Sequence, residues 1–294
     1  GYLGAMRSGI VNIYKPSGIS SSAAVGRVKR ALGTRAVGHM GTLDPIGEGV
    51  LLMGVGKGTR LFEYMLGKSK TYEARFRFGA TADTLDRTGV VTATTDIIPD
   101  EKTIRDALPL LVGEYDQLPP LYSAKSVDGV RAYKLARNGL TPELKRARVR
   151  IDSFVLIERT DDAEWLFRID CSSGTYIRSL CRDLAEKCGS LALMTSIKRT
   201  RCGAWYASDA IAPDEITEAD IIPLADALFA LPRFDAPDEE YKKLSNGVPV
   251  PSDAAPDGKC ALYCRGELFG IAENADGTLR LRTYLKEDNA YAGD

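Results

Sequence analysis

A glycine-rich stretch around one Asp-Pro pair constrains this chain more than any other part of its sequence. Residues 38–49 contain four glycines and the only histidine in the protein, His39. Glycine allows tight turns and lets a ligand approach the main chain closely, and Pro45 favours an extended backbone at Asp44. The apolar residues 50–53 predict a buried strand at one end of this loop. The stretch is typical of a rigid loop that displays a carboxylate, although on this pattern alone an ordinary Asp-Pro turn is the commoner explanation.

Periodic apolar residues predict both helices and strands. Alternation with a period of two, which gives a strand one buried face, recurs at 10–14, 71–78, 149–157 and 165–171. Helical spacing that ends at a glycine recurs at 22–32, 61–66, 103–112 and 176–188. The elements interleave without strict strand-helix-strand repetition, so we expect an α+β fold with a mixed or antiparallel sheet.

The charge of the chain is unevenly distributed. Residues 1–203 carry a net charge of +9 and residues 204–294 a net charge of −10. This asymmetry points to a polyanionic partner for the basic part, with a solvated mixed surface as an equal alternative on charge alone. An insertion at about 117–150 holds eight basic and two acidic residues between Lys125 and Arg150. Tyrosines interleave with these charges, as in surfaces that bind phosphates and stack on bases, so we expect RNA or DNA contact. The candidate contacts are Lys134, Arg137, Lys145 and Arg146.

The acidic C-terminal part predicts a separate small unit. Prolines interrupt it, and short alternating strands are expected at 260–263 and 279–284, with glycines around them. We therefore expect two domains, a larger one over 6–235 and a short β-rich one over 236–294.

Composition excludes several classes of function. The six cysteines show no CxxC spacing and the chain has one histidine, so we do not expect a Cys/His zinc site. Scattered thiols are typical of proteins from a reducing cytoplasm. No apolar run is long enough to span a bilayer and no signal-like segment opens the chain, so we expect a cytoplasmic location.

Arg178 occupies an unusual place in the helix expected over 176–188. It lies in the first turn, where the helix dipole disfavours a cation unless an anion faces it. Arg178 is therefore a candidate partner for a carboxylate or a phosphate, with an ordinary surface arginine as the alternative.

Six motifs occur together in an order that is typical of one enzyme family. They lie at 13–21, 38–45, 70–72, 83–86, 119–124 and 171–178. In these motifs the chain closely resembles the TruB-type tRNA pseudouridine synthases, which convert the T-loop uridine of tRNA, position 55, to pseudouridine. The resemblance covers about residues 9–205. It implies a mixed-sheet catalytic domain followed by an RNA-binding domain of the PUA type, and neither a metal nor an organic cofactor.

The resemblance also assigns roles to individual residues. Asp44 falls on the catalytic aspartate of the family, Tyr72 on a tyrosine that stacks on the target base and is implicated in proton abstraction, and Arg178 on the arginine that pairs with the aspartate. His39 matches a histidine that helps to hold the flipped nucleotides, and Lys15 a lysine that supports the catalytic loop. The remaining matches are Tyr176 and Asp86, near the pocket, and Ile197, where the family usually has a leucine under the base. The chain departs from the family pattern at Tyr14, Met40 and Ser173, without loss of a group that the reaction needs.

The reaction fits a chain without a nucleotide-binding fingerprint or a metal cluster. Pseudouridine formation breaks the C1′–N1 bond, turns the uracil and rebonds it through C5, with no redox change and no external acceptor. Asp44 could attack C1′ or C6, or remove the C2′ proton, and the sequence leaves these routes open. A facing Arg178 would favour the ionised carboxylate. The target base must be flipped out of its loop before any of these steps.

Three other functions compete with this interpretation. The basic insertion and the C-terminal unit also fit a non-catalytic RNA-binding or tRNA-folding protein. A pseudouridine synthase that works with guide RNAs is a second alternative, although the chain lacks the extended basic tails of such relatives. A glycosidase is the third, but no suitably separated pair of carboxylates can be identified. We expect the chain to act on tRNA as a monomer, without a membrane, a protein partner or a guide RNA.

Overall fold

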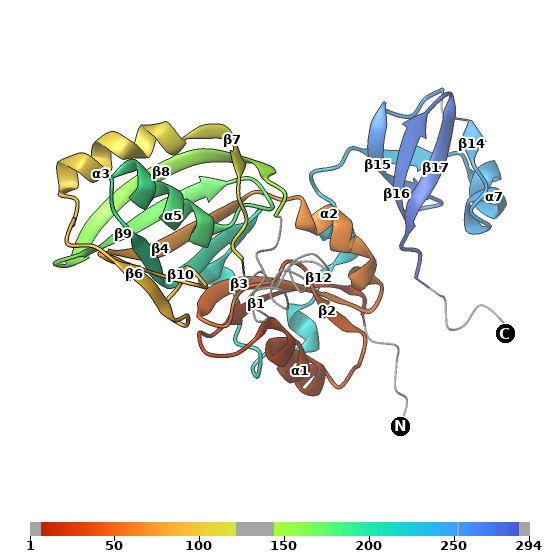
Figure 1. The fold of residues 1–294 in the computed structure, drawn as a ribbon. Helices are drawn as coiled ribbons and strands as arrows, with labels where there is room; N and C mark the ends of the chain where they lie inside the picture. Colours follow the sequence, from red (N-terminus) through yellow and green to blue (C-terminus); the bar gives the residue numbers. More distant parts are fainter. Residues whose placement is uncertain (1–6, 122–143, 252, 288–294) are drawn as a thin grey trace.

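The computed structural model describes residues 7–121, 144–251 and 253–287. Its centre is a ten-stranded sheet in the order β12-β1-β3-β10-β4-β9-β8-β7, with β2 beside β3 and β11 beside β10 (Figure 1). The strands are β1 (Gly9–Lys15), β2 (Val37–His39), β3 (Gly47–Val55), β4 (Lys70–Phe78), β7 (Gly113–Gln117), β8 (Ala147–Asp161), β9 (Glu164–Cys171), β10 (Ala192–Cys202), β11 (Trp205–Tyr206) and β12 (Ile222–Pro223). Among these described strands, only β3 and β10 pair in parallel, so the sheet is mixed.

The helices begin and end where their capping residues require. The Oγ of Ser20 accepts from the backbone N–H of Ala23 over 3.0 Å at the start of α1, and Gly33 ends the helix in the left-handed conformation, with φ +66°. Pro109 follows α3 closely, and the chain continues there as the short 3₁₀ helix η2. The helices are α1 (Ser21–Leu32), α2 (Phe62–Leu66), α3 (Glu101–Ala107), α5 (Ile177–Lys187), α6 (Leu224–Ala227) and α7 (Tyr241–Ser245), and the 3₁₀ segments are η1 (Gly56–Leu61), η2 (Leu108–Leu111), η3 (Ala207–Asp209), η4 (Glu218–Asp220) and η5 (Asp238–Glu240).

Two groups of helices pack on different parts of the large sheet. Helices α3 and α5 cover β4, β8, β9 and β10 (Figure 1), where Phe76, Phe167 and Leu180 belong to one buried cluster. Helix α1 packs against β1 and β3 through a second cluster that contains Val28 and Leu51. The boundary between the two clusters is the β3–β10 junction, which therefore lies inside the sheet and away from its edges.

A second sheet of five strands forms the C-terminal unit, upper right in Figure 1. Its order is β13-β15-β16-β17-β14, formed by β13 (Arg233–Ala236), β14 (Val250–Pro251), β15 (Gly258–Cys264), β16 (Glu267–Ala275) and β17 (Thr278–Tyr284). Leu285 and Ile271 pack in one buried cluster with Leu61 and Met65, next to α2. A separate hairpin pairs β5 (Ala80–Ala82) with β6 (Val91–Thr94).

The structure confirms the expected α+β class, with a mixed sheet and a β-rich C-terminal unit. The strand β10 was not expected from the sequence, and neither were β13, β14 and β16. The division into domains at residue 236 stays a proposal, and β13 lies across it. Within the described part of the chain, no helix has the length and apolar character needed to cross a membrane. Two of the candidate RNA contacts, Lys134 and Arg137, lie outside the described residues.

Candidate active site

The loop that carries Asp44 connects β2 to β3 and is fastened by the segment after β1. The Nζ of Lys15 is buried and donates to the carbonyl oxygens of Pro16 over 2.8 Å, Ile19 over 2.6 Å and Pro45 over 3.3 Å. An ammonium group has three donors, and these three carbonyls take all of them. Burial outweighs the nearby carboxylates and lowers the pKa of Lys15 from 10.5 to about 8. Lys15 therefore holds the backbone directly after Asp44.

Serines from the same segment complete the attachment. The hydroxyl of Ser21 accepts from the N–H of Leu43 over 3.0 Å and donates to its carbonyl over 2.8 Å, so it holds the residue before Asp44 from both sides. The hydroxyl of Ser17 donates to the carbonyl of Ile46 over 2.7 Å, and the N–H of Gly18 donates to that of Pro45 over 2.7 Å. The backbone on either side of Asp44 is thus fixed by the chain at 15–21.

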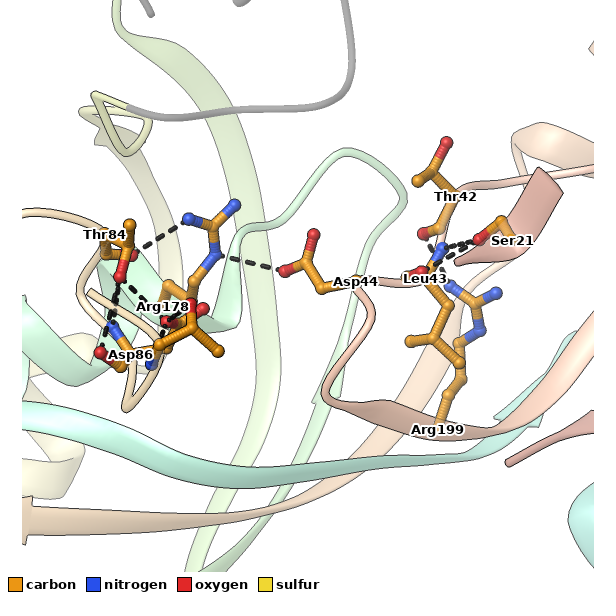
Figure 2. A network of polar contacts seen from close by, with 9 residues as sticks. Ser21, Thr42, Leu43, Asp44, Thr84, Asp86, Arg178 and Arg199 are labelled. Carbon is orange, nitrogen blue, oxygen red and sulfur yellow. Dashed lines mark hydrogen bonds and ion pairs between the residues drawn. The ribbon is translucent and has the colours of Figure 1, made fainter. Parts of the chain in front are cut away.

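Arg199, on β10, holds the same loop from within the sheet. Its side chain is buried and donates from Nε to the carbonyl of Val50 over 2.8 Å and from Nη2 to that of Gly41 over 3.1 Å. Longer contacts join Nη1 to the carbonyl of Thr42, at 3.4 Å, and to the hydroxyl of Tyr72, at 3.5 Å. Figure 2 shows Arg199 beside Thr42 and Leu43, on the side of the loop away from Arg178.

Close backbone approach makes this arrangement possible. Gly49, in β3, has φ +106°, and a Cβ there would lie 2.2 Å from the carbonyl oxygen of Arg199. Only glycine fits such a position without displacing β10. The close packing of β3 against the parallel strand β10 therefore explains why the loop motif has a glycine at position 49.

Asp44 and Arg178 face each other across the site (Figure 2). The Nε of Arg178 lies 3.1 Å from Oδ2 of Asp44, and its Nη1 donates to the carbonyl of Thr84 over 2.9 Å. The side chain of Arg178 is 7% exposed and that of Asp44 is 28% exposed. The cation is therefore held inside the protein while the carboxylate remains open to a substrate. This resolves the sequence alternative, because Arg178 is not a surface arginine.

Asp86 shapes the turn that supplies the carbonyl of Thr84. Its buried Oδ1 accepts from the hydroxyl of Thr84 over 2.8 Å and from the N–H and hydroxyl of Thr88 over 2.9 Å and 2.5 Å. Leu85, between Thr84 and Asp86, has φ +63°, which non-glycine residues seldom adopt. The Asp86 carboxylate therefore stabilises a tight turn and does not line the pocket next to Asp44.

A pocket with an empty volume of about 530 Å³ opens beside Asp44. Its lining combines the charged pair with apolar and aromatic groups, and consists of Thr42, Leu43, Asp44, Tyr72, Thr175, Tyr176, Ile177, Arg178, Met194 and Ile197. The pocket thus brings together Asp44, Tyr72, Ile197 and the neighbouring pair Tyr176 and Arg178, which come from four separate segments. Burial raises the pKa of the Tyr72 phenol to about 12, and the positive charge of Arg199 opposes that rise.

His39 lines a second, neighbouring pocket. This pocket is also formed by Gly41, Thr42, Phe62 and other residues of α2 and of the turn at 173–174. Burial, followed by the charge of Arg199, lowers the pKa of His39. In the described residues its Nδ1 is buried without a hydrogen-bond partner. Thr42 lines both pockets, so they lie side by side.

The described end of the basic insertion is partly neutralised. Arg148 lies 3.3 Å from Glu114 and 3.5 Å from Asp116, on the neighbouring strand β7. Arg146 donates to the carbonyl of Asp116 over 3.2 Å, and Lys145 is exposed. The cations of this segment are therefore not equivalent, and Lys145 is better placed than Arg148 to meet a phosphate.

Several residues of the site were missed from the sequence, and two of these hold it through buried hydrogen bonds. Arg199 is one, and Gln117 is the other. Gln117 is wholly buried, accepts from the N–H of Tyr176 over 2.9 Å and donates to its carbonyl over 3.1 Å. A third hydrogen bond joins its Nε2 to the hydroxyl of Tyr115 over 2.9 Å. The signal available for Gln117 was its position directly before the Leu-Pro-Pro run, at the entry to the insertion.

Known sequences match the chain over most of its length. The family described as TruB family pseudouridylate synthase (N terminal domain) matches residues 29–177. The tRNA pseudouridine synthase B of Thermobifida fusca is 39% identical over 287 residues, which are 93% of this chain and 97% of that protein. The protein of the same name from Thermotoga petrophila is 42% identical over 252 residues, which are 83% of this chain and 80% of that protein.

Solved structures share the fold. A Cbf5-Nop10-Gar1 complex contains a chain that is 23% identical, with a TM-score of 0.68 over 96% of this chain and 83% of that one. An H/ACA RNP bound to a substrate RNA containing 2′-deoxyuridine gives a TM-score of 0.67 at 20% identity, over 97% of this chain and 90% of the other. The family match, the identity to its curated members and the shared fold agree, and the chain belongs to the TruB family of pseudouridylate synthases.

Proposed function

We propose that the pocket beside Asp44 receives the T-loop uridine of tRNA and that Asp44 drives its conversion to pseudouridine. The chain is a tRNA pseudouridine synthase, an isomerase that exchanges the C1′–N1 bond of uridine for a C1′–C5 bond. The choice of the T-loop uridine, the flipping of that base and the part played by each residue are the proposal. The observation that carries it is the partly exposed carboxylate of Asp44, fixed beside buried Arg178 and facing a lining of apolar and aromatic groups.

The pocket suits a base that must leave its sugar and return. Tyr72 and Ile197 offer flat or apolar contacts to a uracil ring, while Asp44 can reach the sugar or the base as a nucleophile or a base. Because both the bond broken and the bond formed lie within one nucleotide, the pocket needs to hold only that nucleotide. Arg178 orients Asp44 through an ion pair in a partly dehydrated site.

Access to the pocket requires the uridine to leave the T-loop. Base flipping costs a few kcal/mol, which contacts to the phosphates can offset. Lys145 and Arg146, with Lys134 and Arg137 outside the described residues, are the contacts we propose in the basic insertion. For His39, which lines the neighbouring pocket, we propose contact with a nucleotide next to the target.

We further propose that the protein works in the cytoplasm as a monomer, without a guide RNA or a protein partner. Its near full-length similarity to proteins named tRNA pseudouridine synthase B supports this proposal. The C-terminal sheet is consistent with a PUA-like domain, for which we propose a part in RNA binding. Purified chain that modifies a T-stem-loop RNA while sedimenting as one copy would agree with this, and activity confined to a dimer would contradict the monomer.

The decisive test replaces Asp44. Asp44→Asn keeps the shape of the side chain, so a T-stem-loop RNA should still bind, while pseudouridine formation, read by mass spectrometry of the digested RNA, should be abolished. Asp96→Asn, at an exposed aspartate that does not line the pocket, is the matched control and should leave the rate unchanged. Full activity of Asp44→Asn would overturn the assignment of Asp44. Wild-type protein that binds the RNA without isomerising it would instead favour a tRNA-folding role.

A further inference from the structure

Arg199 connects the two parts of the site that must act together. It lies on β10, between β3 and β4, and is only 2% exposed. One edge of its guanidinium contacts the carbonyls of Gly41 and Thr42, just before Asp44, and Nη1 also reaches the hydroxyl of Tyr72. Nε is tied to Val50 on β3. A single planar group thus sets the position of the Asp44 loop and of the phenol together.

The guanidinium of Arg199 is surrounded by uncharged hydrogen-bond acceptors. Among the described residues it forms no ion pair with a carboxylate, and its hydrogen-bond acceptors are three carbonyls and one phenol. Burying a cation without an anionic partner costs free energy, so the question is on which group the positive charge of Arg199 could act. Of the four acceptors, only the Tyr72 hydroxyl can itself become an anion.

The surroundings of Tyr72 oppose ionisation of its phenol, so the positive charge of Arg199 has a group on which to act. Burial raises the pKa of its phenol, and the nearby thiols of Cys171 on β9 and Cys202 on β10 raise it further. Arg199 is the group that acts in the opposite direction. Asp44 and Arg178 line the same pocket and complete the set of charged groups around it.

We propose that Arg199 is a positioning residue that holds the Tyr72 hydroxyl in register with the Asp44 loop and stabilises negative charge on that hydroxyl. This inference rests on the proposed function and on the part in proton abstraction that the family resemblance implies for Tyr72. After C5 has bonded to C1′, C6 of the ring is doubly bonded to N1. A phenolate can accept the proton from C5, the electron pair of the C5–H bond then forms the C5–C6 double bond, and the displaced C6–N1 pair moves to N1, which takes up a proton. Arg199 does not line the pocket, so it acts through Tyr72 and the loop and does not touch the substrate.

A purely structural Arg199 would tie β3, β4 and β10 together without affecting the phenol. The structural role and the proposed positioning role predict different effects of conservative substitutions at Arg199. Arg199→Lys keeps the charge and loses the fork of donors, whereas Arg199→Gln keeps a donor and loses the charge. Arg201 provides a matched control on the same strand, because it donates to Thr71 and Ser69 and does not reach Tyr72.

The test measures the phenol directly. 3,5-Difluorotyrosine placed at position 72 alone has a more acidic phenol than tyrosine, and its ionisation can be followed by ¹⁹F NMR in the full-length protein. We expect its pKa to rise by roughly one unit or more in Arg199→Gln, because a charge within about 4–6 Å has an effect of this size. Arg199→Lys and Arg201→Gln should leave it close to the wild-type value. Equal pKa values in wild type and Arg199→Gln would overturn the proposal.

Kinetics of the Tyr72-containing variants provide the second measurement. Arg199→Lys should lower the single-turnover rate on a T-stem-loop RNA by about 10- to 100-fold, because the loop is held less firmly, with little change in the dissociation constant. A raised dissociation constant with an unchanged rate would overturn the proposal even if Arg199→Gln does not fold. The proposed function and the proposal for Arg199 are tested separately. The activity of Asp44→Asn tests the proposed function, whereas the titration of the phenol at position 72 tests the role of Arg199.

Discussion

Arg178 donates to Asp44 from one side of its guanidinium and to the carbonyl of Thr84 from the other, over 3.1 Å and 2.9 Å. Thr84 belongs to the turn that Asp86 stabilises, so the direction of the Asp44 carboxylate depends on a segment forty residues further along the chain. The pair is also asymmetric in burial, because the arginine is inside and the aspartate is open to the pocket. Such an arrangement orients a reactive carboxylate without covering it.

The first prediction concerns this pair. Arg178→Lys retains a positive charge but replaces donors on two sides of a planar guanidinium with one ammonium on a flexible stem, so Asp44 and Thr84 should be held less firmly. We expect the single-turnover rate to fall on the order of 10²-fold, with little change in the dissociation constant of the RNA. Rapid-quench assays on a T-stem-loop RNA would measure both quantities. A rate equal to that of wild type would mean that charge alone suffices at this position.

The second prediction concerns Gln117, which clamps the backbone of Tyr176 directly before α5. Gln117→Met keeps the approximate shape of the side chain and removes three hydrogen bonds. The free energy of unfolding should fall by roughly 1–3 kcal/mol because buried polar groups lose their partners. The rate should fall as well, since Tyr176 and Arg178 both depend on this turn.

Ser190→Ala is the control for Gln117→Met. The buried hydroxyl of Ser190 donates to the carbonyl of Ile97, away from the pocket lining. Its loss should lower stability with no effect on the rate at a temperature where both variants are folded. Urea unfolding and single-turnover assays would compare the two. If both variants lose stability and neither loses rate, Gln117 supports the fold only.

The third prediction is a pH dependence that originates at Lys15. The pKa of Lys15 is about 8 in the folded protein, against 10.5 as its ordinary value. Between these pH values the unfolded chain binds a proton that the folded chain has lost, so the free energy of unfolding contributed by Lys15 rises with pH. The difference in unfolding free energy between wild type and Lys15→Met should therefore increase from about pH 8 to about pH 10.5 and be flat below that window. Parallel stability curves for the two proteins throughout this range would contradict the shift.

The fourth prediction distinguishes two cations of the basic insertion. Lys145→Ala should reduce the slope of log K against log salt for tRNA binding by about 0.7 to 0.9, the value for one lost phosphate contact. Arg148→Ala should change it less, because Glu114 and Asp116 already offset the charge of Arg148. Filter binding at several salt concentrations would provide both slopes. Equal slopes for the two variants would contradict the prediction that exposed Lys145 contributes more to phosphate binding than paired Arg148.

Local signals in the sequence predicted much of the fold. Gly33 placed the end of α1 correctly, because capping depends on residues close to the helix end, and the expected start at residue 22 was one residue late. The alternation at 71–78 predicted β4 for the same kind of reason. Asp44 and Arg178 were paired in the prediction only through the family resemblance, since no local pattern relates two residues so far apart.

The rest depends on contacts between distant segments. Strand β10 has bulges between Met194 and Ser196 and between Arg199 and Arg201, and these interrupt the alternation that reveals a strand. Its lysine and arginines also gave the stretch the composition of a surface. Arg199 is buried only because Gly41, Thr42 and Val50 bring carbonyls to it from 149 or more positions away.

The position of β10 inside the sheet has a consequence for how the protein is made. Strands β3 and β4 are synthesised early, but β10, which pairs with both of them and lies between them, is synthesised much later. Contacts of such large sequence separation form late and slowly. A nascent chain that carries Asp44, Tyr72 and Arg178 but not yet β10 therefore has no assembled pocket, although it is tethered to a ribosome, where tRNA is abundant. The enzyme becomes competent only when its last central strand has been translated and inserted.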